Sequence, residues 1–156
     1  MSSNLTSSTN LNNMFILPVQ GAKWAVQRYP HKLNVISVER ETPVDAGLCK
    51  HHLQLDVDDL DFDNPKHRTL PEKYKFATRE DILKAVDFAK KYKVHIIHCA
   101  AGVSRSPAIA YAILRSQGMS KDEAMKEVFR INPHSYPNPW IVKLTDEIFG
   151  GNYKTK

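Results

Sequence analysis

The stretch "HCAAGVSRSP", from His98 to Pro107, joins an apolar run to the start of an amphipathic segment. The residues before it, Val94–Ile97, are typical of a short buried strand. Pro107 suits the first turn of a helix, and apolar residues then recur at helical spacing as far as Gly118. The stretch is therefore predicted to connect the carboxyl end of a strand to the amino end of a helix, which is where open α/β sheets bind ligands.

A connection of this kind is able to bind a tetrahedral oxyanion, because successive backbone N–H groups converge at the helix start and the helix dipole adds positive potential. Gly102 permits a tight turn and a close approach to a ligand, while Arg105 offers two parallel donors to two phosphate oxygens. Cys99 lies at the foot of this cradle, where the same field stabilises its nucleophilic thiolate. The residue types predict a thiolate that attacks bound phosphate. The predicted phosphate-binding residues are Ala100, Ala101, Gly102, Val103, Ser104 and Arg105.

The chain around this stretch alternates β-rich runs with helical patterns. Strands are predicted at residues 14–19, 33–38, 52–57 and 94–97. Helices are predicted around Trp24, after Thr78, from Pro107 to Gly118, from Ser120 to Arg130, and from Asn138 to Gly150. The pattern indicates an α/β fold with a central, largely parallel sheet flanked by helices and a phosphate-binding loop between a strand and a helix.

The length and composition indicate one globular domain. The chain has 156 residues, of which 42% are hydrophobic and 25% charged. We expect the domain to span residues 14–150, with a flexible Ser-, Thr- and Asn-rich tail at 1–13 and a C-terminal tail at 151–156. Residues 58–76 carry many charges and two prolines without a sustained period, which predicts a long surface loop.

Other global features predict a cytoplasmic monomer. No stretch approaches the roughly 18 apolar residues of a membrane span, and the N-terminus lacks the pattern of a secretory signal. The two cysteines are too few for a disulfide scaffold. The net charge of +5 is compatible with a phosphorylated, nucleic-acid or anionic-lipid partner, and equally with a solvated surface.

The quoted stretch resembles the Cys-x5-Arg-Ser/Thr motif of the cysteine-dependent protein tyrosine phosphatases, in particular their dual-specificity branch. The matching positions are His98, Cys99, Gly102, Arg105 and Ser106. At the usual residue frequencies, these five positions match by chance on the order of once in millions of sequence windows. The resemblance in element order extends over residues 14–149. The low-molecular-weight phosphatases and arsenate reductases carry their motif near the N-terminus, so its position here argues against them.

The resemblance implies a role for each of several side chains. Cys99 is the nucleophile, Arg105 binds the phosphate, and Ser106 assists the sulfur as a leaving group. The family uses an aspartate on a mobile loop as general acid, and aligning the strand "HLQLDV" with its equivalent places Asp59 there, with Asp58 as the alternative. The resemblance implies no metal and no organic cofactor.

Three further groups of residues have more than one interpretation. His98 ends a strand, so its side chain is expected to point away from that of Cys99 and to order the loop rather than move protons. Asn138 either matches an Asn that packs near the phosphate loop in relatives or is a plain helix N-cap. The remaining candidates, Cys49, His51 and His52, have no supporting ligand set and are interpreted as structural.

The acidic run after the third strand was also considered as a calcium site. Asp59, Asp61 and Asp63 have the initial spacing of an EF-hand loop, but Asn64 replaces the required glycine and Leu70 replaces the bidentate glutamate. No metal site is predicted.

The resemblance implies a phosphatase that hydrolyses phosphotyrosine, and also phosphoserine or phosphothreonine, in proteins through a cysteinyl-phosphate. An RNA 5′-phosphatase and a phosphoinositide phosphatase are the alternatives. A non-catalytic phosphate-binding module is a third hypothesis, and it predicts loss of the cysteine, the arginine or the acid. This chain retains all three.

Overall fold

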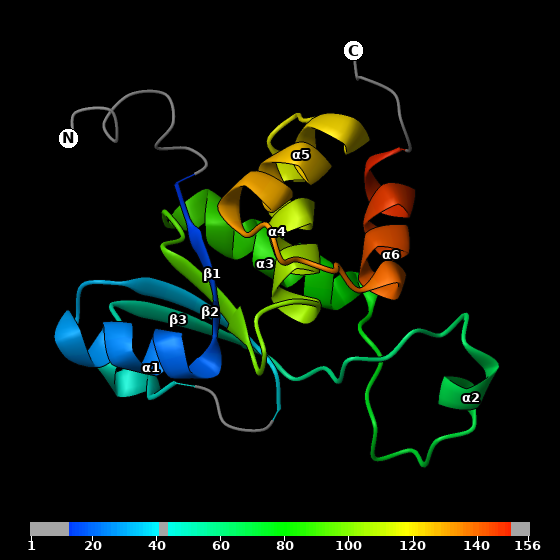
Figure 1. Ribbon diagram of the computed structural model, residues 1–156, viewed down its shortest axis with the longest axis horizontal. Coiled ribbons are helices and arrows are strands. Elements are labelled where there is room, and N and C mark those ends of the chain that lie inside the picture. Colours follow the sequence, from blue (N-terminus) through cyan, green and yellow to red (C-terminus); the bar gives the residue numbers. More distant parts are fainter. Residues whose placement is uncertain (1–12, 41–43, 151–156) are drawn as a thin grey trace.

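The computed structural model describes residues 13–40 and 44–150 (Figure 1). Its centre is a four-stranded sheet in the order β1-β4-β2-β3, and every neighbouring pair is parallel. The strands are β1 (Phe15–Pro18), β2 (Asn34–Val38), β3 (His51–Leu55) and β4 (Ile96–Cys99). The predicted α/β fold with a parallel sheet is confirmed. The tails predicted at 1–13 and 151–156 lie outside the described residues, apart from Asn13.

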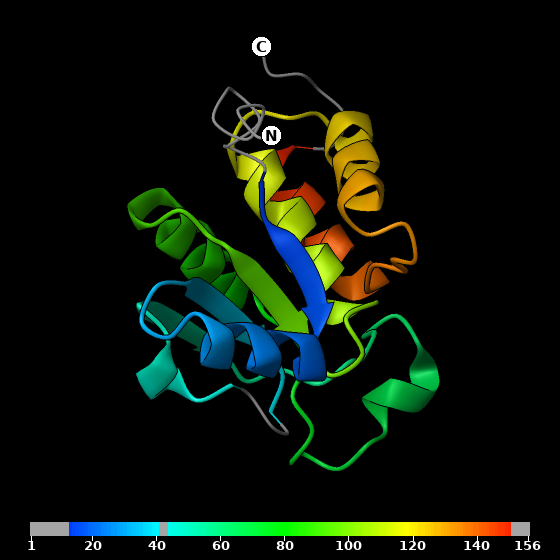
Figure 2. The same ribbon diagram turned by 60° about the vertical axis from the view of Figure 1, so that its left-hand side comes forward.

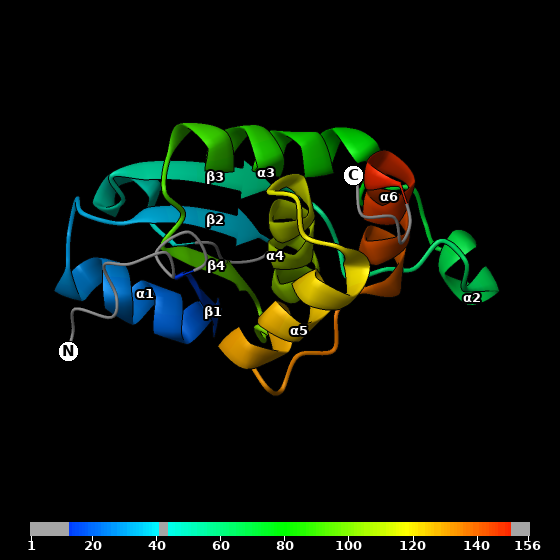
Figure 3. The same ribbon diagram turned by 90° about the horizontal axis from the view of Figure 1, so that it is seen from above.

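Helices cover both faces of the sheet (Figures 2 and 3). One face carries α1 (Val19–Arg28) and the short 3-10 helix η3 (Ala46–Leu48). The other carries α3 (Arg79–Lys91), α4 (Arg105–Ser116), α5 (Lys121–Ile131) and α6 (Pro139–Phe149). Alternate strand residues enter the two cores, so that Ile36 and Ile97 pack on the α4 side while Val35 and Ile96 pack on the α1 side.

The α4 helix is the centre of the larger core. It contacts β4 and also α3, α5 and α6, and its residues from Arg105 to Arg115 are all buried. Two of its buried polar side chains contact one carboxylate: Tyr111 donates to Asp146 Oδ1 at 2.6 Å, and Arg115 Nη1 pairs with the same oxygen at 2.5 Å. This anchoring places the amino end of α4 beneath the carboxyl edge of the sheet.

Element boundaries differ from the sequence-based expectation in a few places. Val19 is the first residue of α1 rather than the end of β1, and β4 begins two residues later than predicted, where its pairing with β1 starts at Ile96. The predicted 58–76 loop contains a one-turn helix, α2 (Pro65–Arg68), whose N-cap Asn64 accepts a bond from the Lys66 N–H. The Asn64–Pro65 pair is the local signal for this turn.

Among residues 13–40 and 44–150, no helix combines the length and apolar character needed to cross a membrane.

The start of α3 is stabilised by a reciprocal cap. Thr78 Oγ1 accepts a bond from the Asp81 N–H, and Asp81 Oδ2 accepts one from the Thr78 N–H. We expect Thr78→Ala to lower the free energy of unfolding by about 1 kcal/mol, measured by urea denaturation. Thr78→Ser keeps the acceptor and serves as control. Equal midpoints for all three proteins would show that the cap does not stabilise the domain.

Candidate active site

The loop of residues 100–104 lies between β4 and α4, so Cys99 is the last residue of the strand and Arg105 the first of the helix. The Cys99 Sγ is buried and lies 3.3 Å from the Gly102 N–H nitrogen and 3.5 Å from that of Ser106. Ser106 Oγ is 3.2 Å from the same sulfur. The structure therefore brings the predicted nucleophile together with polar groups that stabilise negative charge on sulfur.

Gly102 packs directly on the end of β1. Its φ is +77°, and a Cβ placed on it would lie 2.6 Å from Pro18 N and 2.7 Å from Leu17 C. Both neighbours are backbone atoms that cannot swing aside, so only glycine fits. This close packing holds the loop low enough for the Gly102 N–H to reach the sulfur.

A segment between α5 and α6 holds the outer side of the loop. The carbonyls of Gly102, Val103 and Ser104 accept bonds from Asn132 Nδ2 (2.9 Å), Tyr136 N (2.6 Å) and Asn138 N (3.0 Å), respectively. Because the carbonyls turn toward this segment, the N–H groups of the same peptide units face the other way, as an anion-binding nest requires. Sequence reasoning did not identify Asn132 or Tyr136, which have no fixed spacing from the motif.

The Arg105 side chain is buried and linked to the segment that follows β3. Its exposed fraction is 6%, and Nη1 donates to the Val57 carbonyl at 2.9 Å. A guanidinium fixed in this way keeps its orientation before a ligand arrives, which lowers the entropy lost on binding.

The two candidate acids, Asp58 and Asp59, have different hydrogen-bond partners. Asp58 Oδ2 accepts from Arg40 Nη1 at 2.7 Å and from the Lys75 N–H at 2.8 Å, which connects the two ends of the 58–76 loop. Asp59 is exposed, and its Oδ1 accepts from Ser104 Oγ at 2.7 Å. Of the two carboxylates, that of Asp59 therefore contacts the phosphate-binding loop.

Asn138 combines the two interpretations that its sequence position allowed. Its Oδ1 accepts from the Ile141 N–H at 2.9 Å and caps α6. Its Nδ2 donates to Asp59 Oδ1 at 2.8 Å and to the Leu60 carbonyl at 3.0 Å. Asn138 is thus a helix cap that also positions the acid loop.

His98 lies in a buried polar chain behind the nucleophile. Its Nε2 is 2.6 Å from Ser37 Oγ, which is 2.8 Å from His52 Nε2, and its Nδ1 is 3.2 Å from Glu39 Oε2. Burial lowers the pKa of His98 to about 4, and the positive charges of Lys23 and Arg105 act in the same direction. The imidazole is accordingly neutral near pH 7. Glu39 was missed by sequence reasoning, although an acid directly after a buried strand is a usable signal.

Of the remaining candidates, His52 joins the polar chain of His98 through Ser37, His51 stacks on Tyr92, and Cys49 lies in the core on the α1 side of the sheet. Cys49 is buried, and burial together with the nearby Asp45 carboxylate raises the pKa of its thiol to about 11. Within the described parts of the chain, no three His, Cys, Asp or Glu side chains gather in a way that would hold a metal ion. Asp63 of the acidic run instead pairs with Lys143 at 2.9 Å.

The chain is similar in sequence to a known phosphatase over a short stretch and similar in fold to several solved structures. No protein-family model matches the chain. Human dual specificity protein phosphatase 8 is 42% identical over 60 residues, which is 35% of this chain and only 10% of that protein. The crystal structure of human DUSP28 superposes with a TM-score of 0.61 at 19% identity, over 88% of this chain and 92% of that one. The structure of PTPMT1 in complex with PI(5)P superposes with a TM-score of 0.61 at 21% identity, over 89% of this chain and 92% of that one.

The chain has the dual-specificity phosphatase fold. Over the 60 matched residues, the sequence is also similar to a dual specificity protein phosphatase, which agrees with the resemblance that the motif indicated. The loop after β4, in which the motif predicts a phosphate cradle, lies between β4 and the amino end of α4.

The neutral, buried His98 makes the stability of this phosphatase fold depend on pH. The unfolded histidine takes up a proton near pH 6.5 and the folded one only near pH 4, so stability is full above this window and falls as pH decreases through it. The loss reaches roughly 3 kcal/mol at most. We expect His98→Gln to flatten this part of the profile, measured by urea unfolding across the window.

The control for this experiment is His134→Gln, which removes an exposed histidine. Identical pH slopes in the wild type and His98→Gln would contradict the assignment of the slope to His98.

Proposed function

We propose that this chain is a phosphoric monoester hydrolase that acts on phosphoproteins, foremost on phosphotyrosine and also on phosphoserine or phosphothreonine. The observation that carries the proposal is that the Cys99 sulfur and the Asp59 carboxylate both contact the segment from Gly102 to Ser106, the sulfur through backbone N–H groups and the carboxylate through Ser104 Oγ. A nucleophile, an oxyanion cradle and an acid within one site are the parts that phosphoryl transfer through a covalent intermediate requires.

In the first step, the Cys99 thiolate attacks phosphorus in line. The S–P bond forms as the P–O bond to the leaving group breaks. The backbone N–H groups of residues 100–105 and the Arg105 guanidinium hold the three equatorial oxygens, and protonated Asp59 gives its proton to the departing alkoxide or phenoxide. The product is a cysteinyl-phosphate and a neutral alcohol or phenol.

In the second step, water attacks the cysteinyl-phosphate. The Asp59 carboxylate, now unprotonated, takes the proton of the attacking water. The S–P bond breaks, and Ser106 Oγ, 3.2 Å from the sulfur, donates to the departing thiolate. Inorganic phosphate leaves, and the scheme uses no metal and no organic cofactor.

A protein substrate is favoured over two alternatives. The 42% identity to human dual specificity protein phosphatase 8 supports phosphoproteins, whereas the structural likeness to PTPMT1, solved with PI(5)P, supports a phosphoinositide. The net charge of +5 is compatible with an RNA 5′-phosphate as well. A panel of phosphopeptides, phosphoinositides and 5′-triphosphorylated RNA discriminates among the three, with Cys99→Ser as the blank for each substrate.

We expect Cys99→Ser to abolish turnover while it retains phosphate binding, because a hydroxyl is scarcely ionised where a thiolate is. Arg105→Lys should lower kcat/KM by roughly 10²- to 10³-fold, because a point charge cannot replace a bidentate fork. Steady-state hydrolysis of an aryl phosphate measures the turnover of each variant. Displacement of bound phosphate by vanadate measures the phosphate binding that Cys99→Ser retains. Substantial turnover by Cys99→Ser would remove Cys99 from its role, and absence of turnover by the wild type on the whole panel would favour a phosphate-binding module.

The role of Asp59 is tested with leaving groups of different basicity. Asp59→Asn should slow an aryl phosphate with a poor leaving group by about 100-fold or more, because that oxygen needs a proton to depart. A substrate with a good leaving group should be slowed far less, and the basic limb of the pH–rate profile should flatten.

Asp58→Asn is the matched control, since it makes the same chemical change on the neighbouring residue, whose carboxylate faces Arg40. It should leave both properties nearly intact. The opposite pattern in the two variants would transfer the acid role to Asp58.

A further inference from the structure

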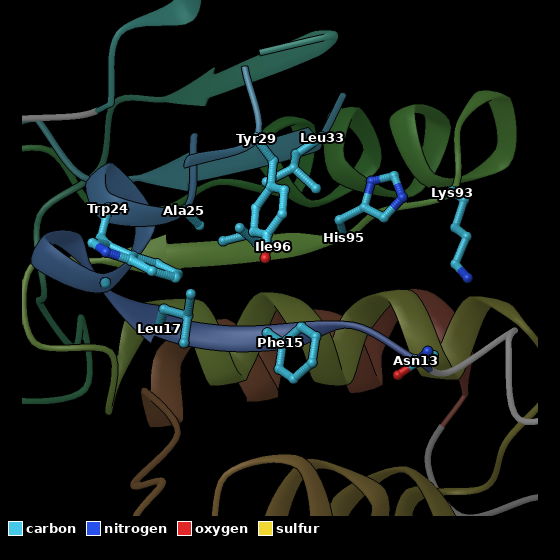
Figure 4. A pocket seen from close by; sticks show the side chains of 11 residues that line it. Asn13, Phe15, Leu17, Trp24, Ala25, Tyr29, Leu33, Lys93, His95 and Ile96 are labelled. Atoms are coloured by element: carbon cyan, nitrogen blue, oxygen red, sulfur yellow. The ribbon is translucent and has the colours of Figure 1, made fainter. Parts of the chain in front are cut away.

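An apolar groove lies between β1 and α1, on the sheet face opposite α4 (Figure 4). Its volume is about 410 Å³, which is in the range of sites that bind small molecules. Aliphatic side chains line it: Leu17 of β1, Ile96 of β4 and Leu33 of the loop before β2. No residue of the phosphate-binding loop contributes, so the groove is separate from the candidate active site.

Three aromatic side chains border the groove and remain largely in solvent. The exposed fractions are 59% for Phe15, 62% for Trp24 and 45% for Tyr29. Figure 4 shows Phe15 on β1, Trp24 on α1 and Tyr29 at the carboxyl end of α1, around one hollow. An exposed apolar patch of this kind on a folded domain marks a surface that another apolar body covers. Trp and Tyr are the aromatic residues that favour a boundary between hydrocarbon and water.

The surroundings of the groove are positively charged. The chain has no acidic residue before Glu39, so α1 and the loop after it contribute Lys23, Arg28 and Lys32 without a nearby carboxylate in the sequence. Lys93 stands at the opposite end of the groove from Trp24 (Figure 4).

These four cations form no ion pair within the parts of the chain that the structure describes; the basic side chains that do form ion pairs lie elsewhere. His95 also lines the groove and adds no charge near pH 7. Burial lowers the pKa of its imidazole, and the positive charges of Lys93 and Lys50 lower it further. The complementary partner is therefore anionic.

The shape and chemistry of the groove distinguish among anionic partners. Single-stranded nucleic acid requires aromatic faces on which successive bases stack, but Trp24 and Tyr29 meet edge to face, at 6.4 Å and 83°. The aliphatic floor matches a hydrocarbon chain instead. Besides Lys93, the Arg28 guanidinium lies 5.0 Å from the centre of the Tyr29 ring, which lines the groove. Separate cations beside an apolar groove fit a surface of many negative charges better than a single charged ligand.

We propose that the α1–β1 face binds an anionic phospholipid surface. One acyl chain occupies the groove, Trp24 and Tyr29 lie at the hydrocarbon boundary, and lipid headgroups pair with Lys93, Arg28 and their basic neighbours. The arrangement is that of a peripheral membrane contact, in which buried apolar area and attraction to anionic lipid act together.

Co-sedimentation with vesicles tests this contact. The protein should bind vesicles of phosphatidylcholine with phosphatidylserine, and binding should weaken in high salt and on vesicles of phosphatidylcholine alone. Lys93→Gln and Arg28→Gln should each lower the partition coefficient by about fivefold, and Trp24→Ala should lower it further through lost apolar burial. The matched controls are Lys84→Gln and Leu83→Ala, which make the same kinds of change at exposed positions on α3. Thermal unfolding verifies that each variant is folded.

Fluorescence tests the depth of the contact. Trp24 and Trp140 are the two tryptophans of the chain, and Trp140 Nε1 donates to the Ala77 carbonyl, away from the groove. Phosphatidylserine vesicles with brominated acyl chains should quench the emission of Trp140→Phe, in which Trp24 remains, and leave that of Trp24→Phe nearly unchanged.

Absence of vesicle binding, binding independent of phosphatidylserine, or equal loss in groove and control variants would overturn the proposal. So would binding of single-stranded RNA or of an acidic peptide that depends on Trp24 and Lys93 in the absence of vesicle binding. Neither readout uses hydrolysis, so an inactive phosphatase would leave this test intact.

Discussion

The contact between Gly102 and the end of β1 is the constraint on which the candidate site depends. Because Gly102 has no side chain and a positive φ, the loop descends until its N–H lies 3.3 Å from the Cys99 sulfur. The edge strand β1 is therefore part of the site, since its Pro18 pairs with Cys99 and its backbone is the surface on which the loop rests. A larger residue at 102 would separate the N–H donors from the sulfur they face.

Asp59, the candidate acid, is positioned by a second junction, where three distant segments meet. Asp59 follows β3, Ser104 belongs to the phosphate-binding loop, and Asn138 starts α6, yet one carboxylate oxygen accepts bonds from both of the other side chains. Asn138 also caps α6 and holds the Leu60 carbonyl. Docking of α6 and placement of the acid are consequently coupled: a change that loosens the start of α6 also displaces the carboxylate from the loop.

Sequence reasoning reached the parts of the site that have a fixed local spacing. Cys99, Gly102, Arg105 and Ser106 lie in one strand–loop–helix connection, where backbone geometry relates them directly. Glu39 was not found, since it approaches the loop region from another strand, where it is fully buried beside His98. That Glu39 lies beside His98 depends on the pairing of β2 with β4, which the spacing of residues along the chain does not give.

The local signals of the sequence were sufficient for the helix caps at Thr78, Ser120 and Asn138 and for the strand–loop–helix connection at residues 99–105, because each depends on residues a few positions apart. The parallel α/β class followed from the alternation of strand and helix patterns along the chain. Only the folded chain settled three other features. These are the strand order β1-β4-β2-β3, the choice between Asp58 and Asp59 as the carboxylate that meets the loop, and the gathering of Phe15, Trp24 and Lys93 around one groove. These features depend on contacts between residues that are tens of positions apart, and such contacts are set by which faces the core buries and not by the spacing of residues along the chain.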